Sequence, residues 1–395
     1  MAEVVQYHLE QMLGELEDLE RRKLFTKSEL KTIVKKRTKF EYGLRRRRVK
    51  QSSFLQYIAY EINVDTLRRK RKNRATSSSK KKDDGDKRSL SDYSIGRRIV
   101  SIFERALTRH PEDVSLWLQY IDFVGTSDHS EDGEASMRAL SKIYAAAITK
   151  HPYEAKLWIM AAAHELDASS NGGAARLLLQ RALRVNPKDR ALWLEYFRLE
   201  LLLVEKVKAR RRVLGIDGSE ESKEEEEEGD SVIALPALDE EAEFEQRIED
   251  AAMAKAAPSS VIRSVDQAQE SAYLQGGVAV IVFDQAIAAI PGDWQFRREF
   301  AAVAAQFPAA TSGAVIRRVH DSIGADFAGS SEARSFLCSA CLASVDAQSP
   351  AFVDALRCAV ANYAAALGED GASPGLWAAY AEFLSHWHAA VADNP

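Results

Sequence analysis

The hydrophobic positions of this sequence follow the period of an amphipathic helix, and one arrangement of them occurs five times along the chain. Each copy begins with a helix-like segment that contains a large apolar residue and, three positions later, an alanine. A break that includes proline follows, and a second segment then contains a tryptophan. Because proline cannot continue the first helix, each copy predicts two helices joined by a tight turn.

In four copies the large apolar residue precedes the tryptophan by fourteen positions, whereas the copy with Phe283 and Trp294 shortens this spacing to eleven. We expect the large residues and tryptophans to fill the core and the alanines to let neighbouring helices approach closely. The predicted core residues, which include tyrosines three positions after some tryptophans, are Phe103, Ala106, Trp117, Tyr120, Tyr144, Ala147, Trp158, Leu179, Ala182, Trp193, Tyr196, Phe283, Ala286, Trp294, Tyr363, Ala366, Trp377 and Tyr380. Stacked helix pairs of this kind predict an all-α fold, an α-solenoid.

The spacing of the tryptophans indicates where the repeats are interrupted. Trp117, Trp158 and Trp193 are separated by 41 and 35 residues, which is the length of one helix pair. Trp193 and Trp294 are 101 residues apart, which requires an insertion between repeats. The intervening sequence contains five consecutive glutamates at 224–228, so the insertion is acidic.

These spacings and the local composition predict five parts of the chain. They are a basic helical N-terminal module at 1–72, a polar linker at 73–90, three repeats at 91–204, an acidic, largely disordered insertion at 205–277, and further repeats at 278–395. A degenerate repeat at 314–344 is expected between Trp294 and Trp377. The chain ends soon after Trp387 without a polar capping helix, from which we expect either a partner at that end or a C-terminal truncation of a longer protein.

The charges are divided unevenly along the chain, although the formal net charge is only -5. Residues 1–98 carry 27 Lys and Arg against 14 Asp and Glu, a net of +13, so the remainder has a net of -18. Such asymmetry indicates that the basic part meets an anionic partner. Its densest clusters, the candidate contact residues for RNA or a partner, are Arg45, Arg46, Arg47, Arg48, Arg68, Arg69, Lys70, Arg71 and Lys72.

Counterion release from phosphates and the forked geometry of arginine are the physical reasons to consider RNA at these clusters. Three other interpretations fit the same residues: a solvated basic helix face, a nucleolar localisation signal, or a docking site for an acidic protein. The sequence leaves these alternatives open.

Two parts of the sequence resemble a known family. The second helix of the third copy, LWLEYFRLE at 192–200, resembles the half-a-TPR (HAT) repeat, which is nearly confined to RNA-processing assemblies. The basic blocks at 19–47 and 54–74, together with KLWIMAA at 156–162, resemble the family of U3 small nucleolar RNA-associated protein six. Members of that family usually continue through more C-terminal repeats than this chain has room for.

The resemblance implies a non-catalytic scaffold in the UtpB subcomplex of the small-subunit processome. Its implied partners are WD-repeat and other subunits of UtpB, and U3 small nucleolar ribonucleoprotein with pre-ribosomal RNA, contacted directly or indirectly. The implied location is the nucleolus, and the implied process is pre-18S ribosomal RNA processing and 40S subunit biogenesis. Two alternatives are a direct RNA-binding module and a HAT scaffold of messenger-RNA splicing or 3′-end processing.

Other chemistry finds little support in the sequence. We find no catalytic or phosphate-binding motif and expect neither enzymatic activity, a cofactor nor a small-molecule substrate. Cys338 and Cys341 have a spacing typical of metal ligands, but no second pair follows, so we interpret them as core thiols. No run approaches the roughly 20 apolar residues of a membrane-spanning helix.

Overall fold

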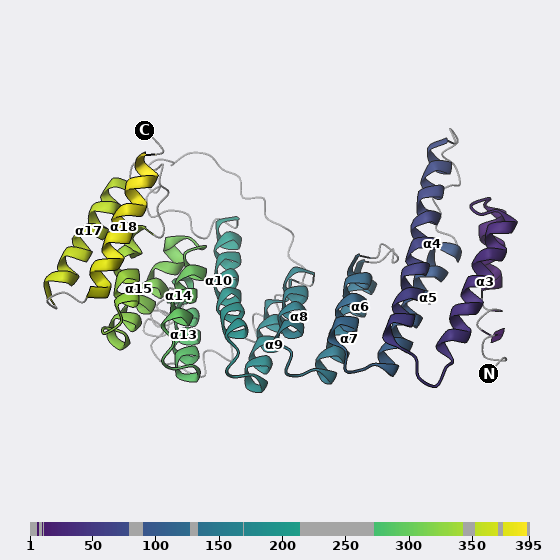
Figure 1. Cartoon of the computed structure of the whole chain (residues 1–395), viewed down its shortest axis with the longest axis horizontal. Helices are drawn as coiled ribbons and strands as arrows, with labels where there is room; N and C mark the ends of the chain where they lie inside the picture. Colours follow the sequence, from purple (N-terminus) through teal and green to yellow (C-terminus); the bar gives the residue numbers. More distant parts are fainter. Residues whose placement is uncertain are drawn as a thin grey trace, which may run out of the picture. The chain divides into compact units, whose positions relative to one another are not determined.

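The computed structural model describes residues 6–7, 10, 12–78, 90–126, 133–168, 170–213, 272–342, 352–369 and 374–392. Every regular element in these ranges is a helix, so the predicted all-α fold of helical-hairpin repeats is confirmed (Figure 1). The chain divides into two compact units, Met1–Asn171 and Gly172–Pro395.

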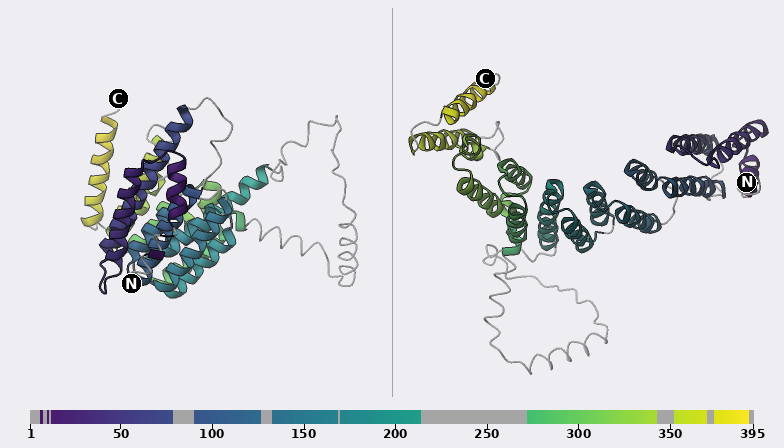
Figure 2. Two further views of the ribbon diagram at one scale, coloured as in Figure 1. Left: turned by 90° about the vertical axis from the view of Figure 1, so that its right-hand side faces the viewer. Right: turned by 60° about the horizontal axis from the view of Figure 1, so that its bottom comes forward.

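The first unit contains the N-terminal module and the first two repeats. Its helices are α2 (Leu13–Arg21), α3 (Lys27–Leu44), α4 (Gln51–Ser78), α5 (Leu90–Arg109), α6 (Val114–Thr126), α7 (Gly133–Lys150) and α8 (Ala155–Asp167). Helix α5 packs against α2, α4 and α6, so the N-terminal module and the first repeat share one core. From α5 to α8 each helix packs against the next, as expected for consecutive hairpins (Figure 2).

The second unit begins with the third repeat. Its elements are α9 (Gly172–Val185), α10 (Arg190–Val213), α13 (Gly277–Ala289), α14 (Trp294–Ala304), α15 (Ala309–Asp326), α16 (Ser331–Ser339), the 3₁₀ helix η1 (Ala340–Leu342), α17 (Phe352–Glu369) and α18 (Pro374–Ala392). Helices α15 and α16 occupy the place of the predicted degenerate repeat. Helix α16 packs against both α17 and α18.

Helices α10 and α13 pack directly on each other, although the predicted insertion separates them in the sequence. The chain enters α13 through Gly276, whose φ of 81° is in the left-handed region. A Cβ at this position would lie 2.8 Å from the backbone oxygen of Thr311 in α15. The position therefore requires glycine, both for its conformation and for the close approach of α15.

Two predicted boundaries differ from the helix ends. Helix α4 continues to Ser78, so the first six residues of the predicted linker at 73–90 are helical. Ion pairs of α4 residues between 65 and 72 are described below. Helix α10 likewise extends to Val213, beyond the predicted end of the third repeat at 204. Residues 79–89 and 214–271 lie outside the described residues.

The tryptophans of the first three repeats make the same contact. The Nε1 groups of Trp117, Trp158 and Trp193 donate a hydrogen bond to the backbone oxygen of the proline six residues earlier, at 3.3, 2.9 and 2.9 Å. Each of these side chains is 7% exposed. The tryptophan thus fastens the second helix of its hairpin to the turn that precedes it.

The other predicted repeat-core residues are mostly buried. The buried ones are Phe103, Ala106, Tyr120, Tyr144, Ala147, Leu179, Ala182, Tyr196, Phe283, Ala286 and Tyr363, whereas Ala366 and Tyr380 are partly buried. The alanines of the first four hairpins are fully buried, which agrees with their proposed place at a close helix contact.

The prediction that Trp294 takes the tryptophan position of its repeat is wrong. Trp294 is the first residue of α14 and is only half-buried, whereas Arg297, fourteen residues after Phe283, is 3% exposed. Its guanidinium donates to the backbone oxygen and Oγ of Ser322 at 2.8 and 2.6 Å and pairs with Asp326 at 2.6 Å. The repeat therefore keeps its spacing, and an arginine bound to α15 replaces the indole.

The prediction that Trp377 is a core residue is also wrong. Its neighbour Leu376 is 1% exposed, but Trp377 is 49% exposed. In the first repeat, Trp117 lines a cavity together with Ile143 and Ala146 of α7, the first helix of the next hairpin. Among the described residues no hairpin follows α18, so the indole of Trp377 has no such cover.

Candidate partner-binding surfaces

A buried group of charges fixes α3 within the N-terminal module. Arg37 is fully buried and donates two hydrogen bonds to the carboxylate of Glu61, both at 2.7 Å. It also donates to Glu15 at 3.0 Å, and Arg98 of α5 donates to Glu15 at 2.6 Å. Glu15 lies on α2 and Glu61 on α4. The group therefore connects α2, α3, α4 and α5 and fixes which face of α3 is exposed.

The pKa of Glu15 reflects two opposing effects. Burial raises the pKa of this carboxyl, but the charges of Arg37 and Arg98, with the hydrogen bonds from Arg98, outweigh it and leave the pKa below its usual value. Glu15 is thus ionised at neutral pH inside the module.

The predicted cluster at the end of α4 is mostly engaged inside the protein. Arg68 is 2% exposed and binds Asp65 and Asp92. Arg69 pairs with Asp65 at 2.8 Å, and Lys72 pairs with Asp92 at 2.8 Å. For Arg68 the prediction of a partner contact is wrong, because its side chain is buried and its charge is already compensated.

Arg71 has a structural role as well. Its guanidinium donates to both carboxylate oxygens of Glu29, at 2.8 and 3.0 Å, and to the backbone oxygen of Leu24 at 2.8 Å. It also lies over the ring of Phe25, 4.7 Å from the centroid. Of this cluster only Lys70 is exposed without a partner among the described residues.

Glu29 belongs to the capping box that begins α3. The backbone amide of Thr26 donates to Glu29 at 2.8 Å, and the amide of Glu29 donates to Thr26 Oγ1 at 3.4 Å. The hydrogen bonds from Arg71 and from the Thr26 amide lower the pKa of Glu29 to about 2.

We expect Glu29→Ala to destabilise the protein by about 1 kcal/mol at neutral pH, because it removes a capping partner and an exposed ion pair. A carboxyl with a lowered pKa stabilises the fold above its ordinary pKa, 4.5, and this contribution disappears as the pH falls towards 2. The difference from wild type should therefore vanish in acid. Denaturation followed by circular dichroism at several pH values would measure it. The exposed Glu17→Ala is the control and should change stability by less than about 0.5 kcal/mol.

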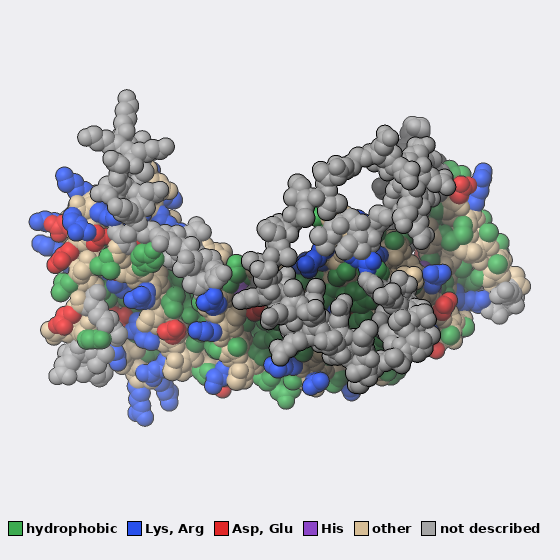
Figure 3. Space-filling view, turned by 180° about the vertical axis from the view of Figure 1, so that it is seen from behind, with side chains coloured by type: hydrophobic (Ala, Val, Ile, Leu, Met, Phe, Trp, Pro, Cys, Tyr) green, Lys and Arg blue, Asp and Glu red, His purple; other side chains and the backbone are tan. Residues whose placement is uncertain are grey.

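The other predicted cluster follows the end of α3 and remains free. Arg45 is half-buried, whereas Arg46, Arg47 and Arg48 are exposed. None of the four has an acidic partner within the ranges that the structure describes. Lys and Arg side chains project from the edge of the N-terminal unit in the space-filling view (Figure 3).

These arginines continue a row of lysines along the exposed face of α3. Lys31, Lys35 and Lys39 recur every fourth residue and are exposed, and Tyr42, 52% exposed, lies on the same face. We define the α3 ridge by the residues Lys31, Lys35, Lys39, Tyr42, Arg46, Arg47 and Arg48. Its lysines and Tyr42 were not among the predicted contact residues, although their helical spacing is visible in the sequence.

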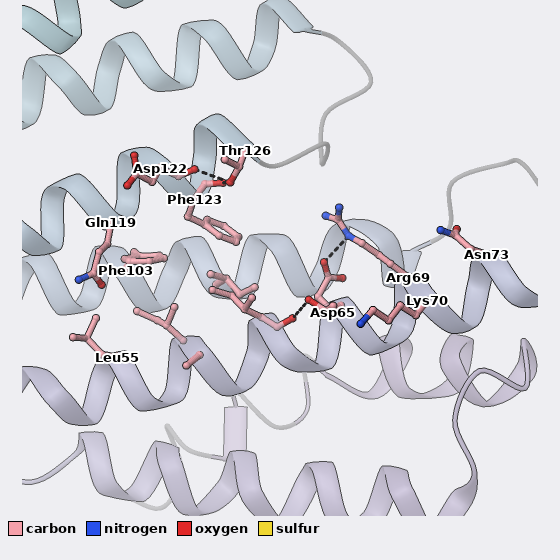
Figure 4. A pocket seen from close by; sticks show the side chains of 15 residues that line it. Leu55, Asp65, Arg69, Lys70, Asn73, Phe103, Gln119, Asp122, Phe123 and Thr126 are labelled. Carbon is pink, nitrogen blue, oxygen red and sulfur yellow. Dashed lines mark hydrogen bonds and ion pairs between the residues drawn. The ribbon is translucent and has the colours of Figure 1, made fainter. Parts of the chain in front are cut away.

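A groove lies between α4, α5 and α6 in the same unit (Figure 4). Its volume is about 750 Å³. Ile58, Ile62, Phe103 and Phe123 supply apolar surface, and Ile62 is 37% exposed. The remaining lining residues include polar and charged side chains towards the ends of the groove, such as Lys70. An apolar centre with polar edges is suited to a segment of another protein.

The described residues provide no metal centre with three or more Cys, His, Asp or Glu ligands. Cys338 is buried, as expected for a core thiol, and burial raises the pKa of its thiol. The Sγ atom of Cys341 lies 2.6 Å from that of Cys358 in α17. Among all the helices that the structure describes, none combines the length and the hydropathy needed to cross a bilayer.

The fold and these surfaces define a helical-repeat protein with a charged helical module at its N-terminal side. Residues 9–98 match the family model of U3 small nucleolar RNA-associated protein 6. The resemblance predicted from the sequence is thereby confirmed. The matched range contains the α3 ridge and the whole of α4, which forms one wall of the groove.

Curated relatives agree with this match. The chain is 41% identical over 214 residues to U3 small nucleolar RNA-associated protein 6 of Schizosaccharomyces pombe, covering 54% of this chain and 41% of the relative. It is 36% identical over 208 residues to the human homolog, covering 53% and 32%. The homolog of Dictyostelium discoideum is 28% identical over 308 residues, covering 77% and 46%. The aligned regions thus span less than half the length of these relatives.

Proposed function

We propose that this protein is a non-catalytic scaffold subunit of the small-subunit processome in the nucleolus. There it associates with U3 small nucleolar ribonucleoprotein and supports processing of pre-18S ribosomal RNA and biogenesis of the 40S subunit. The observation that carries the proposal is the match of residues 9–98 to a family named for U3 association, in a chain built of helical hairpins. Helical repeats expose extended surfaces that hold several chains at once.

The proposed protein partners are the WD-repeat and other subunits of the UtpB complex. The groove between α4, α5 and α6 is the proposed contact, since its lining combines apolar side chains, of which Ile62 is 37% exposed, with polar ones. Phe103 and Phe123 face this groove from α5 and α6 (Figure 4). Aromatic side chains in a concave surface are typical of the residues that dominate binding energy.

Affinity purification of the tagged chain from nuclear extract tests the proposal. The experiment is done at moderate and at high salt, with and without nuclease, and U3 RNA and the co-purifying proteins are both quantified. WD-repeat proteins that persist after nuclease treatment and at high salt support a protein scaffold. Splicing or polyadenylation factors without U3 RNA would contradict the assignment to ribosome biogenesis.

A variant in the groove makes the test specific. We expect Ile62→Asp to reduce recovery of the protein partners at least about tenfold, because it places a charge in an apolar contact. Leu177→Asp is the matched control: Leu177 is 57% exposed on α9, outside the groove. Its purification profile should equal that of wild type. Equal recovery with both variants would mean that the groove is not the partner site.

A further inference from the structure

The α3 ridge presents a row of positive charges at a regular interval. Helical rise gives about 6 Å between lysines four residues apart, a step similar to that between successive phosphates of a nucleic acid strand. Lys31, Lys35 and Lys39 form this row, and Arg46 follows it beyond Tyr42.

Among the residues that the structure describes, no acidic side chain pairs with these charges. Helix α3 contains two acidic residues, and both are already bound: Glu29 to Arg71, and Glu41 to Arg105 at 2.9 and 3.0 Å. Helix α4, which packs against α3, directs Glu61 to the buried Arg37. Within the described part of the module, the repulsion along the ridge is therefore left to be relieved by solvent ions or by an anionic ligand.

Tyr42 distinguishes between classes of anionic ligand. It is the only large hydrophobic side chain of α3 that is strongly exposed, at 52%. A protein interface normally has an apolar core that is poor in lysine, and the ridge has the opposite composition. A positive track with an isolated aromatic ring is instead typical of surfaces that bind single-stranded nucleic acid, where a base stacks on the ring.

We propose that the α3 ridge binds the backbone of single-stranded RNA, with Lys31, Lys35, Lys39 and the arginines at 46–48 contacting phosphates and Tyr42 stacking on an unpaired base. The inference rests on the proposed function in the choice of RNA as the cellular ligand. Binding of purified components is measured separately from purification out of extract, so either proposal can fail without the other.

The test uses the full chain and a fluorescent oligouridine long enough to span α3, with anisotropy recorded over a range of salt concentrations. Wild type should bind with an affinity that falls steeply with salt. Removing three phosphate contacts in K31Q/K35Q/K39Q should make the log–log salt dependence shallower by about 2 and weaken binding at low salt by about tenfold or more. Tyr42→Ala should weaken binding at least about fivefold with little change in salt dependence.

The matched control is K142Q/K156Q/K188Q, which removes the same charge from exposed lysines of later helices and the turns beside them. It should retain the wild-type salt dependence, and circular dichroism should show that both triple variants remain folded. Three outcomes would overturn the proposal: no binding by wild type at low salt, an equal loss in the control, or an unchanged salt dependence in K31Q/K35Q/K39Q. An unchanged RNA affinity with loss of co-purifying proteins would instead identify the ridge as a docking site for an acidic protein.

Discussion

Arg37→Met is expected to destabilise the N-terminal module, helices α2 to α4, by about 3–5 kcal/mol at neutral pH. The arginine is the central partner of two buried carboxylates, at 2.7 Å from Glu61 and 3.0 Å from Glu15. Methionine fills similar space but leaves these charges buried without their main counterion. Urea denaturation, with amide hydrogen exchange of α3 and α4 as a local measure, would determine the loss.

The same substitution should have a characteristic pH dependence. In wild type the lowered pKa of Glu15 means that its contribution to stability is present above 4.5 and is lost as the pH falls through the lower folded value. Without Arg37, the effect of burial on Glu15 outweighs the remaining attraction of Arg98, and the pKa of Glu15 rises. The stability of the variant relative to wild type should therefore increase as the solution becomes acidic. The difference between the two proteins should therefore be largest near neutral pH and shrink below about pH 4.5.

The exposed Arg46→Met is the control and should change stability by less than about 0.5 kcal/mol. A loss below 1 kcal/mol for Arg37→Met would contradict the role of Arg37 as the central partner of the buried charges.

Trp193→Ala should cost about 3–5 kcal/mol, whereas Trp377→Ala should cost less than about 1 kcal/mol. Trp193 is 7% exposed and its Nε1 donates to the backbone oxygen of Pro187 at 2.9 Å, so truncation removes both packing and a hydrogen bond. Trp377 occupies the equivalent sequence position but is 49% exposed. Chemical denaturation followed by circular dichroism compares the two variants directly, and equal losses would show that α18 buries its tryptophan after all.

The repeated helix pairs could be predicted because their signal is local. Proline cannot occupy the interior of a regular helix without breaking or kinking it, and alanine at a close helix contact recurs with the repeat. The exception at Arg297 could not be found in this way. A charged side chain can occupy a buried tryptophan position here because Ser322 and Asp326 of α15 bind it. The residues next to Arg297 in the sequence do not identify these partners.

The basic clusters illustrate the same limit for binding residues. Arg46 and Arg68 look equivalent in the sequence, since both lie in runs of consecutive basic residues. They differ because Asp92, 24 residues after Arg68, approaches it in the folded module. Charge density therefore located the right part of the chain, but only the pairing of charges across helices distinguishes a surface residue from a buried one. The groove required three packed helices and was not predicted.

The contact between α10 and α13 has a consequence for how this chain can vary. These helices pack on each other although residues 214–271 lie between them in the sequence. The turn that leads into α13 tolerates little change, because Gly276 has a φ of 81° and no room for a side chain beside Thr311. We therefore expect this glycine to stay unchanged in every variant that keeps the contact between α10 and α13.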